Sequence, residues 1–408
     1  MSKKKTLPYV MILFLILSIF SIRYFMEEKG KDTETFKRAT IKPIEKPTKL
    51  IEKQLKEMHK LWEVPKSKVR VVATGDIMFH TPQLRSAYNP KDKSYNFYPM
   101  FNKIEKYIKD GDLAIGNFES VSSESDGRFT GYPTFNTPKT SLEALSKVGY
   151  DILSTANNHS LDRGKRGVIE TIENINQYGM KNIGTYKEEN NDILIENIKG
   201  IKIAMLSYSY GFNGLDSRLT KDEFQYMVNK IEEDKIKNDI KNADEQNADI
   251  TIVVIHWGHE YWREPSEYQK ELGDKMIDWG ADIILGSHPH VIQQSKIIEH
   301  NGEKKFIIYS MGNFISNQRR ETLSIRNRKY TEDGVIVNIN LEKDFIENKT
   351  VISKIDYIPT WVYKYRKGNK YLYEIIPGHK SREDYNLIEP VISKIKESHK
   401  NTMEKMAR

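Results

Sequence analysis

The clearest pattern of apolar and polar positions lies between residues 250 and 290. An apolar, β-branched run, Ile250–Ile255, predicts a strand buried on both faces. A helix is predicted next, because Ser266 can cap it, Gln269 completes a capping box, and apolar side chains recur at helical spacing. A second short run, residues 282–286, predicts another strand. The order strand, helix, strand predicts a right-handed crossover in a parallel sheet.

Histidines follow both of these predicted strands. His256 comes directly after the first strand, and His288 and His290 follow the second. Ligands of open α/β sheets bind at the carboxyl ends of the strands. In an extended His-Pro-His segment the two imidazoles share one side, and imidazole is the commonest neutral metal ligand. The three histidines together therefore favour a metal site over ordinary packing.

The same arrangement, an apolar strand followed by polar residues, recurs along the chain. Further strands are predicted at residues 69–73, 113–115, 152–155, 201–208 and 306–309. The polar groups delivered by the earlier strands are Asp76, Asn117, Glu119, Asn158 and His159. A simpler explanation exists for each residue alone, such as a turn for Asp76 or a surface charge for Glu119. Their shared placement favours a site, and carboxylate, amide and imidazole ligands suit Mn²⁺, Fe or Zn²⁺.

The N-terminal pattern is different. Three lysines precede an apolar run, Leu7–Phe25, that is long enough to span a bilayer. No small-x-small cleavage site follows, so an uncleaved anchor is favoured over a cleaved signal peptide. The lysines predict a cytoplasmic N-terminus and an extracellular main domain. The predicted parts are a cytoplasmic tip (1–6), a transmembrane anchor (7–26), a stalk (27–67), a globular domain (68–360) and a C-terminal extension (361–408).

Composition excludes only a few structural features and functions. The chain has 408 residues, a net charge of +7 and no cysteine, which excludes disulfides and a lipidated N-terminal cysteine. No phosphate-binding Gly-x-x-x-x-Gly-Lys-Ser/Thr motif occurs, so ATP-dependent chemistry would belong to other chains. No nucleic-acid partner is expected.

Polar sequence blocks stand in a fixed order between residues 69 and 316. They are Thr74-Gly75-Asp76, Gly116-Asn117-Phe118-Glu119, Ala156-Asn157-Asn158-His159 with Asp162-Arg163-Gly164, His256-Trp257-Gly258 with Glu260-Tyr261, Gly286-Ser287-His288-Pro289-His290 and Tyr309-Ser310-Met311-Gly312-Asn313-Phe314. These blocks resemble the CapA/PgsA family, the membrane-anchored subunits of bacterial poly-γ-glutamate capsule synthesis. The resemblance implies an α/β fold, a four-layer αββα sandwich similar to calcineurin-like metallophosphatases.

The resemblance also implies which residues hold one or two divalent metal ions. The positions that match the superfamily's ligands are Asp76, Glu119, Asn158, His159, His256, His288 and His290. Two positions depart from the pattern. Met78 stands where the superfamily has a histidine, with His80 two residues late, and Ser160 stands where it has an acidic residue. The loss at Met78 would weaken one of two metal sites.

Two functions of different classes follow. The favoured one is an accessory subunit of a membrane-bound poly-γ-glutamate synthase, working in polymer assembly or export with a ligase subunit and an integral membrane subunit. The alternative is an extracellular metal-dependent hydrolase acting on a phosphoester or on the polymer, with His159 and Glu260 as candidates for proton transfer. Met78 favours the first function, and the retained histidines keep the second open.

Several side chains are candidates for binding the anionic polymer. An arginine-rich segment follows the last block, and guanidinium groups bind carboxylates bidentately. We expect this segment to be an exposed loop near the metal site, although an ordinary solvated loop is equally compatible with the pattern. The assigned substrate-binding residues are Asn117, Arg163, Asn313, Arg319, Arg320, Arg326 and Arg328. Beyond them, residues 361–373 predict an edge strand pair and residues 381–408 an amphipathic helix.

Overall fold

The computed structural model describes residues 66–189, 192–378 and 387–407. The predicted anchor and nearly all of the predicted stalk lie outside these residues. Within the described ranges no helix has both the length and the apolar character needed to cross a bilayer. The described residues form one compact unit.

The first sheet carries β1 at its centre. Its strand order is β16 (Lys370–Pro377), β15 (Lys349–Lys367), β14 (Asp333–Asp344), β1 (Lys66–Ile77), β4 (Leu113–Phe118), β5 (Ile152–Ser154) and β6 (Lys181–Ile183), with β13 (Asn313–Ile315) also pairing with β1. The strands from β1 to β6 in this order are parallel, whereas β14, β15 and β16 are antiparallel additions. The carboxyl ends of β1, β4 and β5 therefore lie at one edge.

The second sheet contains the strands predicted most directly from the sequence. Its order is β11 (Ser295–His300), β12 (Glu303–Ile308), β10 (Ile283–Ser287), β9 (Ile250–His256), β8 (Ile201–Ser209) and β7 (Leu194–Ile198). The helix α9 (Glu267–Asp278) connects β9 to the parallel strand β10, which confirms the predicted crossover. Its capping box of Ser266 and Gln269 is present, and Gly280 follows the helix with φ +112°.

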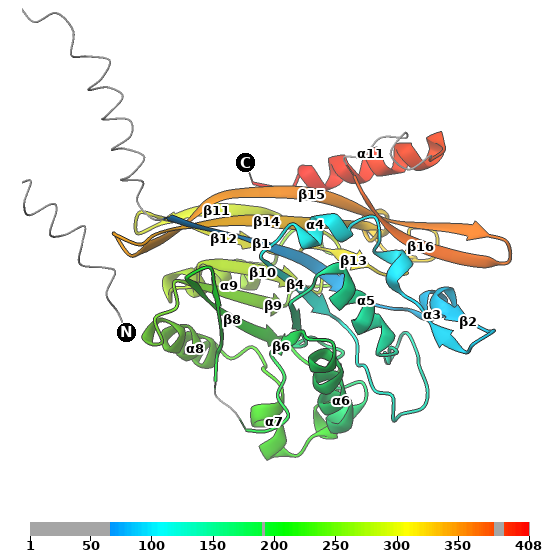
Figure 1. Ribbon diagram of the computed structural model, residues 1–408, viewed down its shortest axis with the longest axis horizontal. Coiled ribbons are helices and arrows are strands. Elements are labelled where there is room, and N and C mark those ends of the chain that lie inside the picture. Colours follow the sequence, from blue (N-terminus) through cyan, green and yellow to red (C-terminus); the bar gives the residue numbers. More distant parts are fainter. Residues whose placement is uncertain (1–65, 190–191, 379–386, 408) are drawn as a thin grey trace, which may run out of the picture. The chain divides into compact units, whose positions relative to one another are not determined.

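Helices cover the outer faces of the two sheets (Figure 1). Apolar side chains such as Val71, Ile203 and Ile252 form the core between the sheets. The helices α4 (Glu105–Lys109) and α5 (Thr140–Val148) pack on the first sheet, and α8 (Glu233–Glu245) and α9 pack on the second. The remaining described helices are α3 (Thr81–Ala87), α6 (Gly164–Gln177), α7 (Lys221–Met227) and α11 (Glu389–Met403). The chain is therefore a mixed α/β sandwich with helix, sheet, sheet and helix layers.

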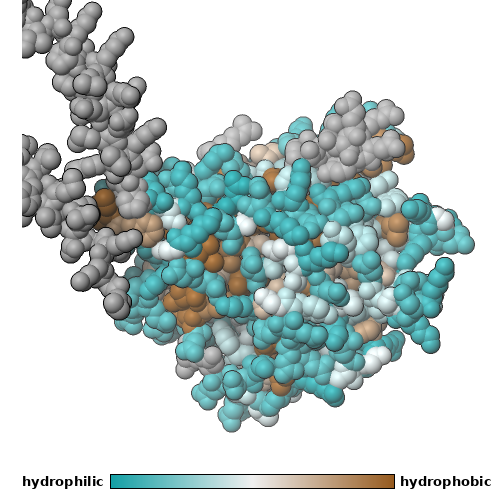
Figure 2. Space-filling view, in the orientation of Figure 1, coloured by the Kyte–Doolittle hydropathy of each residue, from teal (hydrophilic) through white to brown (hydrophobic). Residues whose placement is uncertain are grey.

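The C-terminal residues are part of this unit. The predicted edge strand pair is present as β15 and β16, but β15 passes through residue 360, where the domain was predicted to end. Helix α11 packs on the end of this pair through Val391, Ile392 and Ile395, against Trp361. The predicted boundary at residue 360 therefore falls inside a strand, and the described residues beyond it are not a separate extension. The face of the unit seen in Figure 2 is mainly hydrophilic over the described residues.

Candidate metal centre

Buried polar side chains meet where the strands of both sheets end. Asp76 lies near the end of β1 beside Asn117 of β4, and His256 ends β9 beside Ser287 of β10. All four side chains are buried. Gly75 permits the close approach of β1 to the segment Ser310–Phe314. A Cβ atom at this position would lie 2.0 Å from the carbonyl oxygen of Gly312. The topology predicted from the strand ends therefore brings distant segments together.

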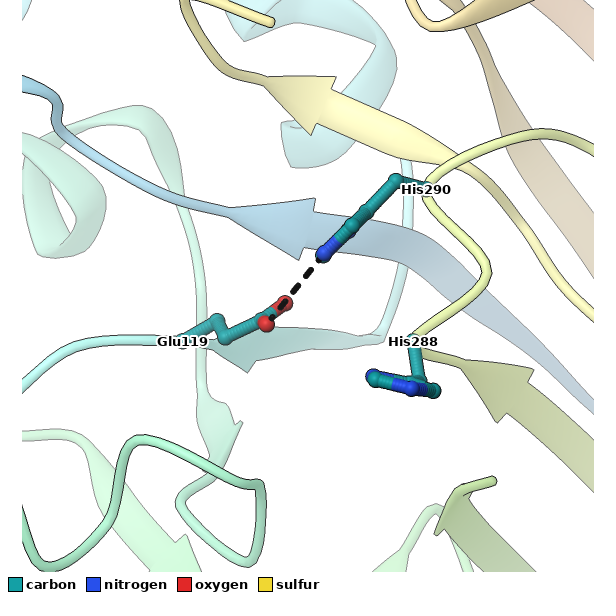
Figure 3. A group of neighbouring side chains, drawn as sticks. All are labelled: Glu119, His288 and His290. Carbon is teal, nitrogen blue, oxygen red and sulfur yellow. Dashed lines mark ion pairs between the residues drawn. The ribbon is translucent and has the colours of Figure 1, made fainter. Parts of the chain in front are cut away.

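Glu119 lies at the centre of the cluster. Its carboxylate is fully buried, and neither oxygen has a hydrogen-bond partner. Oε1 lies 3.6 Å from His256 Nε2 and 3.8 Å from His290 Nε2, and Figure 3 shows Glu119 and His290 pointing toward one another. Burial, and then the neighbouring Asp76 carboxylate, raise the pKa of Glu119 well above its ordinary value. An unpartnered buried carboxylate is costly, which makes this position suited to a cation.

Asp76 orients two of its neighbours. Its Oδ2 lies 2.9 Å from His290 Nδ1, and its Oδ1 accepts a hydrogen bond of 2.8 Å from Asn117 Nδ2. His290 therefore uses Nδ1 toward Asp76 and has Nε2 on the side of Glu119. The Asn117 side-chain oxygen accepts from Asn157 Nδ2 at 3.3 Å. Asn117, predicted to bind substrate, is thus a buried residue that positions Asp76.

His256 and His288 complete the cluster. His256 Nε2 lies 3.1 Å from Asn158 Oδ1, and its Nδ1 lies 2.9 Å from Ser287 Oγ. His288 Nδ1 is buried without a hydrogen-bond partner, and its backbone has φ +96°. Burial, and then neighbouring histidines, lower the pKa of both imidazoles well below the ordinary value. Neutral imidazole is the form that binds metal.

The donor set fits a divalent metal ion. Ligand atoms of Glu119, His288 and His290 lie within 4.8 Å of one another, and so do those of Asp76, Glu119 and His256. Glu119 belongs to both groups, so its carboxylate is a candidate ligand at two neighbouring metal positions. Oxygen and imidazole nitrogen donors without thiolate suit Zn²⁺, Mn²⁺ or Fe. The unpartnered atoms of Glu119 and His288 are the observation that favours a ligand here over a closed hydrogen-bond network.

His159 differs from the other histidines, because it is held by its own carboxylate. Its Nδ1 lies 2.7 Å from Asp162 Oδ2, which also accepts a 2.6 Å hydrogen bond from the backbone N–H of Phe135. This pairing leaves Nε2 as the nitrogen available for proton transfer. Sequence reasoning noted that Ser160 replaces an acidic residue but missed that Asp162, three residues beyond His159, pairs with the imidazole. The His-x-x-Asp spacing within a tight turn is the signal that could have revealed it.

His80 is a second residue whose position relative to the metal cluster was not predicted from the sequence. Its Nδ1 accepts a 3.3 Å hydrogen bond from the backbone N–H of Asn317, and its ring packs edge-on against Phe135. Burial, and then His290 and His159, lower the pKa of His80 to about 3, so it is neutral at physiological pH. Met78, at the expected histidine position, is buried. His80 thus lies beside the cluster but belongs to neither ligand group within the described residues.

The family model for "bacterial capsule synthesis protein PGA_cap" matches residues 70–318, which include every residue of this cluster. The chain belongs to this family. Among curated proteins, this capsule synthesis family member is 28% identical to the capsule biosynthesis protein CapA of Bacillus anthracis, over 72% of this chain and 67% of that protein. It is 27% identical to the PGA biosynthesis protein CapA of Bacillus subtilis, over 60% of this chain and 62% of that protein. The matches therefore span about two thirds of these relatives.

Solved structures show more remote likenesses. The NAD nucleotidase NadN of Haemophilus influenzae has a TM-score of 0.45 at 11% identity, covering 84% of this chain and 64% of that chain. The calcineurin-like phosphoesterase YfkN of Bacillus subtilis has a TM-score of 0.41 at 14% identity, covering 83% of this chain and 99% of that chain.

Two predicted substrate-binding residues of the capsule synthesis family member make internal contacts. Arg163 Nε pairs with Asp126 at 2.7 Å, and its other nitrogens donate to Asp162 O and Thr130 Oγ1. The Asn313 side chain is buried and donates to a neighbouring glutamine and to a backbone carbonyl. Glu260, the other candidate for proton transfer, is exposed.

The arginine-rich segment is not uniformly exposed, which corrects the expectation of four free guanidinium groups. Arg319 is only 3% exposed, lies 3.2 Å from Glu332 and donates to the Val362 carbonyl. Arg320 pairs with the same carboxylate at 3.2 Å and with Glu397 at 3.1 Å. These two arginines fasten the segment to β15 and α11. Their burial follows from acidic partners that are distant in the sequence. Arg326 and Arg328 are exposed, as expected.

Proposed function

We propose that this chain acts outside the cytoplasmic membrane in the assembly or export of poly-γ-glutamate, as a membrane-anchored subunit of a capsule synthase complex. The observation that carries the proposal is the family match over residues 70–318. The relatives named for capsule and PGA biosynthesis support it. ATP-dependent ligation and passage through the membrane would belong to a ligase subunit and an integral membrane subunit on separate chains. The apolar run at residues 7–25 supports the anchored topology.

A second candidate function is an extracellular metal-dependent hydrolase acting on the polymer or on a phosphoester. The unpartnered carboxyl group of Glu119 favours it, because capsule scaffolding alone gives no reason to bury a polar group without a hydrogen-bond partner. A divalent ion held by Asp76, Glu119, Asn158 and the three clustered histidines would supply Lewis acidity for hydrolysis.

The chain's own residues supply the remaining parts of such a reaction. His159, oriented by Asp162 through Nδ1, is placed to move a proton at Nε2. Asp76 keeps the His290 ring in one orientation through a contact of 2.9 Å. The cluster residues are buried, and this low-dielectric surrounding strengthens the charge interactions among them. The exposed Glu260 carboxylate is available to exchange protons with solvent.

Complementation tests the first proposal. A strain lacking this chain should make little or no surface poly-γ-glutamate, and the wild-type chain should restore it. Normal polymer in the deletion strain would contradict a role in capsule synthesis. His159→Gln separates the two functions: a scaffold without turnover would restore normal polymer, whereas a hydrolase would leave its amount or chain length altered.

Protease treatment of intact protoplasts tests the topology. An anchored chain with an external domain should be degraded to a short membrane fragment, because residues after 26 would be accessible. A full-length chain that resists protease until the membrane is permeabilised would contradict the external placement.

A further inference from the structure

A hollow of ≈ 600 Å³ lies between two loops beyond the metal cluster. Its size falls in the roughly 300–1,000 Å³ range of small-molecule sites. One wall is the segment Glu260–Glu264 between β9 and α9, and the other is the segment Ile325–Asn327. Asn327 Nδ2 joins the walls by donating a 2.9 Å hydrogen bond to the carbonyl oxygen of Tyr261. Both of these residues have φ +66°, a backbone conformation rare outside glycine and often found at functional sites.

The hollow adjoins the metal cluster through Tyr261. The backbone N–H of this residue donates a 2.7 Å hydrogen bond to the carbonyl of Pro289, which lies between the two clustered histidines. Its ring centroid lies 6.0 Å from that of His290, and its hydroxyl accepts from Gln318 Nε2 at 3.2 Å. One residue thus lines the hollow and, through its backbone N–H, contacts the segment that carries His288 and His290.

The lining combines an exposed aromatic ring with cationic groups. Trp262 is 56% exposed, so its indole presents a large apolar surface to the hollow. Arg326 is exposed and has no ion pair among the described residues. Arg263 stacks its guanidinium 3.9 Å from the Tyr330 ring centroid, and its buried Nη1 has no hydrogen-bond partner.

Two carboxylates also line the hollow, but they do not cancel its cationic character. Glu264 forms an ion pair with Lys405, so its charge is neutralised within the chain. Glu260 precedes Tyr261, the lining residue that contacts the segment between His288 and His290. Arg263 is held within the wall, since its Nη2 donates to the Asn401 carbonyl at 3.0 Å. The guanidinium group of Arg326 is therefore the charge left to meet an anion in the remainder of the hollow.

We propose that this hollow is a subsite for the γ-glutamyl chain, in which Arg326 binds an α-carboxylate and Trp262 covers the methylene groups of the same unit. The inference rests on the proposed function, which supplies the polymer as ligand. A γ-linked glutamyl unit carries one free carboxylate beside two methylenes, which matches a guanidinium next to an indole face. In this proposal Arg326 binds the polymer, whereas Arg319 and Arg320 of the same segment are paired with Glu332.

Arg328 provides a matched control for Arg326. Both are exposed arginines on one loop, but Arg328 does not line the hollow and donates instead to the carbonyl of Leu323 at 2.8 Å. Replacing either residue with glutamine changes the net charge equally. A general electrostatic attraction would therefore be weakened equally by the two substitutions, whereas a defined subsite would not.

The experiment measures binding of a synthetic oligo-γ-glutamate of defined length to the full-length chain in mild detergent, by calorimetry at physiological ionic strength. We expect Arg326→Gln to weaken binding by about tenfold or more, in line with loss of a charged hydrogen bond. Trp262→Ala should weaken it comparably, Trp262→Phe should restore part of the affinity, and Arg328→Gln should change it less than about twofold. An α-linked oligo-glutamate of equal length should bind more weakly, because its carboxylates are spaced differently.

The outcomes separate the subsite from the function on which it rests. Equal weakening by Arg326→Gln and Arg328→Gln, with wild-type binding intact, would overturn the subsite and leave the proposed function standing. Absence of binding to the wild-type chain would overturn both. Because both arginines and Trp262 are exposed, unchanged thermal unfolding of the variants is expected and excludes misfolding as the cause.

Discussion

Replacing Glu119 with glutamine should separate metal binding from stability. The wild-type carboxylate is buried without a hydrogen-bond partner, and its pKa is raised by burial and by Asp76. A neutral amide of the same size costs less to bury than a carboxylate. The metal-free variant should therefore be at least as stable as the metal-free wild type, by up to about 1–3 kcal/mol. The same substitution removes the ligand shared by both groups of candidate donors.

The metal-induced rise in Tm is expected to be a few degrees. A metal present at about 100 times its dissociation constant stabilises the protein by about 2.7 kcal/mol. For a unit of roughly 340 residues, an unfolding entropy of about 2.1 cal/mol/K per residue corresponds to about 0.7 kcal/mol per kelvin. The wild-type Tm should then rise by about 4 °C. A variant that binds at least about 100-fold more weakly should gain less than about 1 °C at the same metal concentration.

Differential scanning calorimetry of the full-length chain, with chelator and with added Mn²⁺ or Zn²⁺, checks both parts. Glu260→Gln is the matched control, because this exposed carboxylate belongs to neither ligand group and its loss should leave the metal-induced shift unchanged. The reasoning would be refuted if Glu119→Gln lowered the metal-free Tm and kept the full metal-induced rise. That result would make Glu119 a structural carboxylate.

Three further predictions concern other parts of the unit. Gly75→Ala should lower Tm and reduce metal binding in calorimetry, because its Cβ would lie 2.0 Å from Gly312 O and displace the end of β1. Asp162→Asn should leave metal content unchanged in elemental analysis but alter the ¹⁵N NMR signature of the His159 ring, since the contact of 2.7 Å fixes its tautomer. Burial raises the pKa of Asp333 to about 7 from 3.8, so the wild type should lose stability as pH rises through this range, by at most about 4 kcal/mol. Asp333→Asn should flatten that part of the stability profile in urea titrations between pH 4 and 8, and an unchanged slope would contradict this account.

The strands and helices that the sequence predicted correctly are those that depend on neighbouring residues. The strand at Ile250–Ile255 and the capping box at Ser266 each rest on a few neighbouring residues, so they could be predicted without a structure. The grouping of Asp76 with Asn117, and of His256 with His288, was also predictable, because neighbouring parallel strands of one sheet place their carboxyl ends at one edge. The contact between Asp76 and His290 joins the two sheets, so it depends on how the sheets pack and not on the strand pattern.

Features that depend on long-range partners were not predictable. Arg319 is buried because Glu332 and the β15 backbone surround it, and no local pattern distinguishes it from the exposed Arg326. The predicted boundary at residue 360 was wrong for a similar reason. The antiparallel pairing of β15 with β14 and β16 continues through that position and depends on strands on both sides of it.

The most direct test of the metal centre is the metal content of the purified full-length chain and of its His256→Ala and His288→Ala variants, measured by elemental analysis after equilibration with equal Mn²⁺ and Zn²⁺. His256 ends β9 and His288 directly follows β10, and their ring centroids lie 4.8 Å apart. The account predicts bound metal in the wild type and its loss from both variants, with the fold retained. Equal metal in all three proteins, or none in the wild type, would contradict it.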